Sequence, residues 1–368
     1  MRLVIASDSA EERRAYRQAA LDAGLACEAD DCVSVAALPK RLQRGGVDAA
    51  LASVGLDESK ILGAVHRAGA VPLYAVCDSA DDRLVPTMLR AGARGYVRRS
   101  AVAKDLGNVA SDLEAGTCPV SRGQLIAVVG GQHGVGVTTI ATNLAFAAAS
   151  RAPGQVALVQ IVDGGGDLAL HLGIQPEYPL GELAAGWSRL SLASLDRFLL
   201  KYSKGPSILA EQSAGASAVQ WSAVALRHLL VHLRSRFAYV VADFGLAMDA
   251  ARVDALRTAD AVNVVLRLDV PTLEKTRQYV GALAGHGVFG EKLTGIVNFH
   301  GQSEEWPWTK ARAALGLSIG GWIPDDSESV NAARNARKPL VLTARNKPIA
   351  ASFERLAAQQ SAVTRRAA

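Results

Sequence analysis

The sequence predicts an α/β protein made of two doubly wound parallel sheets in tandem, and three observations support this. The chain has 368 residues, more than one hydrophobic core usually serves, so two domains are expected. Apolar strand-like runs alternate with helical stretches in both halves, as in parallel sheets covered by helices on both faces. A segment rich in glycine, proline and serine, residues 116–123, interrupts this alternation. We therefore expect domains at 1–115 and 124–368, joined by this linker.

The composition excludes several classes of protein. Hydrophobic residues make up 49% and charged residues 20% of the chain, which favours a packed core over disorder. No apolar run approaches the length of about 18 residues that a membrane span needs, and Asp8 interrupts the first apolar stretch before a signal peptide could form. The four cysteines lack the spacing of metal ligands or redox pairs, which is typical of buried cysteines in a reducing compartment. We expect a soluble, cytoplasmic protein without a membrane span.

The net charge of +5 comes from the part of the chain after residue 120, which holds 25 Lys and Arg against 19 Asp and Glu. Part of this excess is a basic cluster between Arg334 and Arg366. A solvated basic face is one interpretation of the cluster, and a contact with an acidic protein surface, anionic lipid or nucleic acid is another. Because the excess is small, we do not expect DNA to be a partner.

The sequence of the first domain predicts a strand followed by a crossover helix, repeated about five times. Ligands of such sheets sit at the carboxyl ends of the strands, so these ends are where chemistry is expected. The predicted strands are Arg2–Ala6, Ala49–Val54, Val71–Cys77 and Gly95–Arg98, and the predicted helices include Ala10–Ala23 and Arg83–Ala91.

Over its full length, this domain resembles a two-component receiver domain. Residues 92–100 are similar to the family's Gly-Ala-x-x-Tyr-Leu-x-Lys-Pro segment, with Arg99 and Ser100 in place of Lys-Pro. Ser53 stands where the family has its phosphoacceptor aspartate, and Cys77 replaces the hydroxyl residue of the fourth strand. Phosphoryl transfer to an aspartate needs a carboxylate nucleophile and a magnesium ion. We therefore expect no aspartyl phosphorylation, and an interaction or dimerisation role instead.

Asp8 supplies one carboxylate where receiver domains usually have an acidic pair. A single carboxylate is a weak magnesium site. A second interpretation is that Asp8 caps the helix beginning near Glu11.

The second domain opens with a glycine-rich loop, Gly130–Thr139, between a buried-type strand at Leu125–Val129 and a helix at Ile140–Ala149. Such a loop points backbone N–H groups and the positive end of the helix at one place, which suits a phosphate. Gly131 and Gly136 have the spacing of the P-loop pattern G-x-x-x-x-G-K-[ST].

The wider sequence resembles the ParA/MinD ATPases. The loop, followed by Asn143-Leu-Ala, is similar to their deviant Walker A motif, and Phe237–Asp243 is similar to their Walker B strand. Gly295–Asn298 resembles a later strand whose asparagine reads the adenine in that family. The resemblance implies Mg²⁺ ligands at Thr138 and Asp243. It also implies nucleotide-binding residues at Gly131, Gly134, Gly136, Thr138, Thr139, Asp243 and Asn298.

One branch of that family, the CpaE/TadZ proteins, is the most similar. Residues 165–176 with Leu180–Leu183 resemble its Phe-Gly-Asp-Leu-Ala-Leu block, and Lys338–Leu340 resembles its Gly-Lys-Pro-Leu segment. That branch also carries a degenerate receiver domain in front of the ATPase domain, so the resemblance covers nearly the whole chain. It implies an assembly and localisation factor for Flp/Tad-type pili. The implied partners are a pilus or secretion ATPase and platform proteins at the inner membrane.

The departures from the ParA/MinD motifs fall on the catalytic residues. Gln132 stands at the signature lysine, which in the family reaches across a dimer, and Val137 stands at the P-loop lysine. Gln160 and Val162 replace the Asp-x-Asp pair that helps to orient the attacking water, and His133 replaces a glycine. A hydrogen bond from a lysine to phosphate contributes about 1.5–3 kcal/mol. Losing two of them weakens nucleotide affinity by about two to four powers of ten.

We therefore expect negligible hydrolysis, and any ATP or ADP to be bound weakly with Mg²⁺. The leading hypothesis is a non-catalytic scaffold that places a pilus or secretion machine through protein contacts. The alternative is an ATP-switched dimer of the ParA/MinD class with slow ATPase activity. A homodimer is expected under either hypothesis, and under the first it forms without nucleotide.

Overall fold

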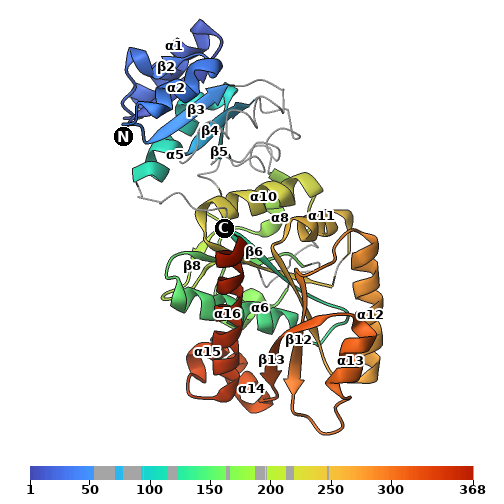
Figure 1. The fold of residues 1–368 in the computed structure, drawn as a ribbon. Coiled ribbons are helices and arrows are strands. Elements are labelled where there is room, and N and C mark those ends of the chain that lie inside the picture. The colour runs from blue at the N-terminus through green and yellow to red at the C-terminus, as the bar shows by residue number, and fades with distance from the viewer. Residues whose placement is uncertain are drawn as a thin grey trace. The chain divides into compact units, whose positions relative to one another are not determined.

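The structure is a computed structural model, and its described residues form two compact units, one within Met1–Arg122 and the other from Gly123 onward. Each unit is a sheet covered by helices (Figure 1), which confirms the predicted α/β class. The predicted helix Arg83–Ala91 and residues 116–122 of the predicted linker lie outside the described residues. Those described are 1–53, 71–77, 93, 95–114, 123–162, 166–186, 195, 197–212, 219–246 and 248–367.

The first unit contains a five-stranded parallel sheet in the order β2-β1-β3-β4-β5. This is the flavodoxin-like order, in which ligands bind at the carboxyl edge. Alternate residues of the strands enter two hydrophobic clusters, as expected for a sheet buried on both faces. The strands are β1 (Leu3–Ser7), β2 (Cys32–Val33), β3 (Ala49–Ser53), β4 (Leu73–Cys77) and β5 (Gly95–Arg98), and the helices include α1 (Ala10–Asp22), α2 (Leu38–Gln43) and α5 (Val102–Glu114).

The start of α1 corrects one prediction. Ser9 is the N-cap, because its backbone is extended and its hydroxyl accepts a hydrogen bond from the Glu12 N–H at 3.3 Å. Asp8 instead accepts a hydrogen bond from the Val35 N–H at 3.1 Å, which ties the loop after β1 to the segment after β2. The interpretation of Asp8 as the helix cap is therefore wrong.

The second unit contains an eight-stranded sheet in the order β13-β12-β11-β6-β10-β7-β9-β8. All neighbouring strands are parallel except β8, which is antiparallel to β9. The strands are β6 (Gln124–Gly130), β7 (Val156–Gln160), β8 (Leu200–Lys201), β9 (Ser207–Leu209), β10 (Tyr239–Gly245), β11 (Ala261–Leu266), β12 (Leu293–His300) and β13 (Ser318–Pro324).

Helices cover both faces of this sheet (Figure 1). The cluster built on Leu125, Ala127 and Val129 packs against α10–α13, and the cluster built on Ile126 and Val128 packs against α6 and α16. The helices are α6 (Val137–Arg151), α7 (Leu168–Leu172), α8 (Leu180–Gly186), α10 (Ala223–Arg236), α11 (Ala250–Thr258), α12 (Val270–Gly285), α13 (Trp308–Leu315), α14 (Ser327–Asn335), α15 (Leu340–Thr343) and α16 (Pro348–Ala367).

Within the described residues, no helix is both long enough and apolar enough to cross a membrane. The helix α6 begins three residues before its predicted start and is buried along most of its length, because α16 packs beside it. Strand β6 lies in the middle of the sheet, so the loop between β6 and α6 opens at the centre of the carboxyl edge. This edge is where open α/β sheets bind their ligands.

Candidate functional site

The glycine-rich loop has the backbone of a phosphate-binding loop. Gly134 and Gly136 have φ of +80° and +99°, in the left-handed region that favours glycine. A Cβ at Gly136 would lie 2.4 Å from the amide nitrogen of Asn298, so the position has no room for a side chain. Gly136 is also the N-cap of α6, and the free N–H groups of the first helical turn therefore open onto the same space.

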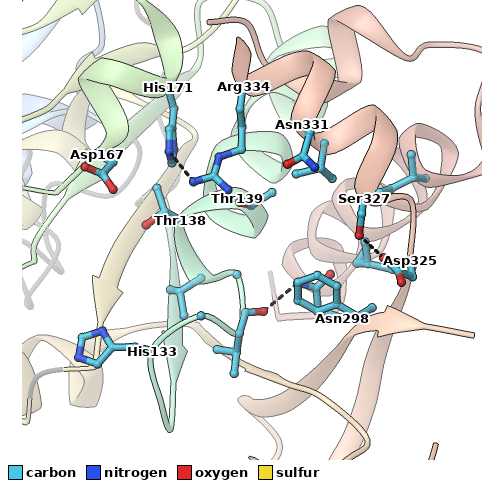
Figure 2. Close-up of a pocket in the computed structure, with 18 of the residues that line it drawn as sticks. His133, Thr138, Thr139, Asp167, His171, Asn298, Asp325, Ser327, Asn331 and Arg334 are labelled. Carbon is cyan, nitrogen blue, oxygen red and sulfur yellow. Dashed lines mark hydrogen bonds between the residues drawn. The ribbon is translucent and has the colours of Figure 1, made fainter. Parts of the chain in front are cut away.

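A cavity of about 710 Å³ lies over this loop, at the carboxyl ends of β6, β10, β12 and β13 (Figure 2). Five of the residues predicted to bind nucleotide line it: Gly134, Gly136, Thr138, Thr139 and Asn298. Two others, Asp243 and Gly131, are not among the lining residues. A Cβ at Gly131 would lie 2.9 Å from Cα of Thr276, so this glycine allows the loop to pack closely on α12.

The two predicted magnesium ligands are in contact. The Thr138 hydroxyl donates a hydrogen bond to Oδ2 of Asp243 at 2.7 Å, and the Gly245 N–H donates one to Oδ1 at 3.1 Å. Asp243 is fully buried, and burial raises the pKa of its carboxyl group to about 6 against the effect of these two bonds. Hydroxyl and carboxylate oxygens suit Mg²⁺, so this pair fits the ion that the ParA/MinD motifs imply.

Asn298, which lies in β12, forms a hydrogen bond with the glycine-rich loop. Its side-chain N–H donates a hydrogen bond to the Val135 carbonyl at 2.8 Å, and its side chain is largely buried. Figure 2 shows it beside the loop, close to Asp325. The contact fixes the loop conformation.

Comparisons with known proteins agree with this geometry. The chain is 23% identical over 257 residues to a septum site-determining protein MinD of Tupiella akineta, covering 67% of this chain and 81% of that protein. A ParA family ATPase from Chlorobium tepidum matches 64% of this chain and 98% of its own, with 20% identity and a TM-score of 0.58. The MinD protein of Pyrococcus horikoshii, solved with Mg-ADP, is 20% identical, with a TM-score of 0.54. The match covers 67% of this chain and 98% of that protein. The second unit has the ParA/MinD fold. No protein-family model matches the chain.

In this ParA/MinD-fold unit, neither lysine position brings a positive charge to the cavity. The Gln132 amide donates a hydrogen bond to Oγ1 of Thr272 at 3.0 Å, which attaches the loop to the start of α12. Val137 is largely buried, with 8% of its surface exposed. Its side chain packs against Gly130: a Cβ added to that glycine would lie 2.7 Å from Cγ2 of Val137. Both side chains therefore have structural contacts in place of a phosphate contact.

Positions 160 and 162, where ParA/MinD ATPases have the Asp-x-Asp pair, also carry side chains that cannot act as a base. Gln160 is buried, and its carbonyl oxygen accepts a hydrogen bond from the Glu211 N–H at 3.1 Å. Val162 lies in the cavity wall and packs beside Gly245. A Cβ added to that glycine would lie 3.1 Å from Cγ1 of Val162. Neither position presents a carboxylate to a water molecule in the cavity.

The structure adds two cavity residues that sequence reasoning missed as site residues, His171 of α7 and Arg334 of α14. Their side chains meet at 3.2 Å (Figure 2). The sequence placed Arg334 in a basic cluster, and no motif links either residue to the P-loop. They are 163 positions apart, so only the packing of α14 against α7 brings them together.

At the carboxyl edge of the first unit, an ion pair stands where a receiver domain has its phosphorylation site. Arg99 pairs with Glu12, and its guanidinium also donates to the Ser53 hydroxyl at 3.4 Å. The Ser7 hydroxyl donates to the same Glu12 carboxylate at 2.7 Å. Over the described part of the chain, there is no group of three or more His, Cys, Asp or Glu side chains that could hold a metal.

We expect a Ser53→Asp variant to remain unphosphorylated by acetyl phosphate and Mg²⁺. The new carboxylate would lie against the Arg99 guanidinium, and Asp8 is already bonded to Val35. Intact mass spectrometry of the variant checks this, with an active receiver protein as the positive control. A gain of about 80 Da, the mass of one phosphoryl group, would show that the ion pair does not block the site.

Proposed function

We propose that this chain is a non-hydrolysing ParA/MinD-fold scaffold that organises the assembly of a Flp/Tad-type pilus or related secretion machine. The proposal rests on the side chains found at positions 132, 137, 160 and 162, which are catalytic in the ParA/MinD ATPases. Gln132 and Gln160 are hydrogen-bonded to Thr272 and Glu211, and two valines occupy the other two positions. The site therefore keeps its shape without its catalytic groups.

Phosphoryl transfer depends on positioning and on cations that stabilise charge on the transferred group. Here both lysines are absent, and no carboxylate at positions 160 or 162 orients an attacking water. The loop N–H groups, the Thr138 hydroxyl and the Asp243 carboxylate remain, and they suit ATP or ADP with Mg²⁺. When bound, Mg²⁺ would neutralise phosphate charge beside Thr138. A nucleotide held in this way serves as a structural ligand.

The pilus role rests on the sequence resemblance to the CpaE/TadZ branch, and the segment of one of its motifs is bound to the helix that follows the P-loop. The Val341 N–H, next to the Lys338–Leu340 segment, donates a buried hydrogen bond to the Asn143 side chain at 3.0 Å. The C-terminal segment is thus attached to the P-loop helix. We infer a cytoplasmic homodimer, recruited to the inner-membrane face by a secretion ATPase and platform proteins. The receiver-like unit contributes protein contacts.

The second candidate is an ATP-switched dimer with slow turnover. The preserved Thr138–Asp243 pair and the positive φ of Gly134 and Gly136 favour it, because these features serve nucleotide binding. The two candidates differ in whether phosphate is released.

We expect no phosphate release above background when about 100 μM full-length protein is incubated for hours with Mg-ATP, because positions 160 and 162 carry no carboxylate that could orient water. An Asp243→Ala variant, which lacks the magnesium carboxylate, sets the background. Equal traces for both proteins support the scaffold. Release by the wild type that is lost in the variant would instead establish the ATP-switched dimer.

A further inference from the structure

The cavity over the P-loop has one strong cation, and it does not come from the loop. Among the described residues that line the cavity, Arg334 is the single lysine or arginine. Figure 2 shows its guanidinium pointing into the cavity between His171 and Thr139, on the side where Thr138 lies. Phosphate oxygens bound to the first turn of α6 would face this group.

Arg334 is held in place by a neutral partner. Burial and the charge of Arg334 lower the pKa of His171 against the smaller opposing effect of Asp167, so its imidazole is neutral near pH 7. Because arginine is a donor without acceptor capacity, Nε2 of His171 accepts the hydrogen bond, 3.2 Å from Nη2 of Arg334. In the described part of the chain, no carboxylate forms an ion pair with Arg334. The guanidinium is therefore oriented by a neutral partner, and Asp167, the carboxylate on this side of the cavity, forms no ion pair with it.

Among the described residues that line the cavity, Asp325 and Asp326 lie at its other end, whereas Asp167 lies on the side of His171 (Figure 2). Asp325 accepts hydrogen bonds from Ser327 and Gln302 at 2.8 Å each. Asp326 caps α14 by accepting from the Ser329 N–H at 3.0 Å, and it pairs with Lys347 at 3.7 Å. These bonds occupy the carboxylates and fix the helix that carries Arg334 in its last turn. Figure 2 shows Asp325 near Asn298, on the far side of the cavity from His171.

We propose that Arg334 replaces the P-loop lysine as the cation that contacts the terminal phosphates of a nucleotide seated on residues 134–139. The inference deepens the proposed function and rests on nucleotide binding by this cavity. A guanidinium offers paired N–H donors that match two phosphate oxygens, and its charge stays fixed at any physiological pH. A bound nucleotide then connects α14, and through His171 also α7, to the loop. The ligand acts as a clamp that joins the C-terminal helices to the sheet.

The test compares Arg334→Ala, Arg334→Lys and a matched control, Arg345→Ala. Arg345 is an exposed member of the same basic cluster and does not line the cavity. Binding of Mg-ATP, inorganic tripolyphosphate and adenosine is measured by calorimetry with full-length protein. Urea unfolding followed by tryptophan fluorescence checks that each variant is folded, and little change is expected because Arg334 is exposed.

We expect Arg334→Ala to weaken Mg-ATP and tripolyphosphate binding by about 10- to 100-fold, with Arg334→Lys intermediate and Arg345→Ala unchanged. Adenosine affinity should not change, because the lost contact is to phosphate. Equal affinities for wild type and Arg334→Ala would overturn the inference and leave the scaffold proposal standing. An absence of wild-type binding to ATP and tripolyphosphate would also overturn it. Phosphate release by wild type would instead contradict the scaffold.

Discussion

Replacing Asp243 with asparagine is expected to stabilise the ligand-free protein at pH 7 by about 3 kcal/mol. Burial raises the pKa of this carboxyl group from 3.8 to about 6, so its ionised form is less favourable in the folded state than in the unfolded chain. Each pKa unit corresponds to about 1.4 kcal/mol. Asparagine has nearly the same shape, keeps an oxygen acceptor and carries no charge. The same change removes a magnesium ligand, so stability is gained at the expense of ligand binding.

The pH dependence provides the control. Well below pH 3.8 both the folded and the unfolded wild type are protonated at this position, and the variant should have no advantage. Between pH 4 and pH 6 the unfolded chain ionises first, so the advantage grows, and above pH 6 it is constant. Urea unfolding followed by tryptophan fluorescence measures it, since all five tryptophans lie in the second unit. A stability difference that does not change with pH would show that Asp243 is ionised in the fold without penalty.

A lysine at position 137 should tighten Mg-ATP binding by about 10- to 100-fold, without producing phosphate release. Val137 lines the cavity at the first position of α6, so a lysine there can extend its ammonium group toward the phosphates while its alkyl chain stays in the wall. Release should remain absent because Gln160 and Val162 are unchanged. Calorimetry and a phosphate assay on the same sample measure both properties.

Val137→Met is the matched control, since it lengthens the side chain without adding charge. We expect its affinity for Mg-ATP to equal that of the wild type. Tightening by methionine as large as that by lysine would mean that packing around the loop, and not the missing charge, limits binding. Phosphate release by Val137→Lys would show that positions 160 and 162 are not needed for turnover.

Local sequence patterns predicted the features that depend on neighbouring residues. The spacing of Gly131, Gly136 and Thr138 located the loop, since a strand–loop–helix unit is a local structure. Apolar runs located strands of the first unit, including Gly95–Arg98 to the residue. The strand β2 was missed because two residues, Cys32 and Val33, carry no periodic signal.

What could not be predicted depends on contacts between distant segments. Gln132 appears in the sequence only as a lost lysine, while the structure shows that it attaches the loop to Thr272, 140 positions away. For the basic cluster that includes Arg334, the sequence leaves open both a solvated face and a contact with an acidic partner, and only the packing of α14 shows that Arg334 lines the cavity. The interpretation of Asp8 as the cap of α1 is wrong because Asp8 and Ser9 have similar capping propensity, and only the backbone dihedral angles show that Ser9 is the cap.

The central claim is that the second unit binds nucleotide phosphates without hydrolysing them. Equilibrium dialysis of full-length wild type and Asp243→Ala against Mg-ATP, followed by chromatography of the nucleotide in each chamber, tests both halves of the claim together. We expect an excess of intact ATP on the wild-type side, a smaller excess with the variant, and no ADP above the protein-free control. ADP accumulating with the wild type, or no excess of nucleotide at millimolar ATP, would contradict the claim.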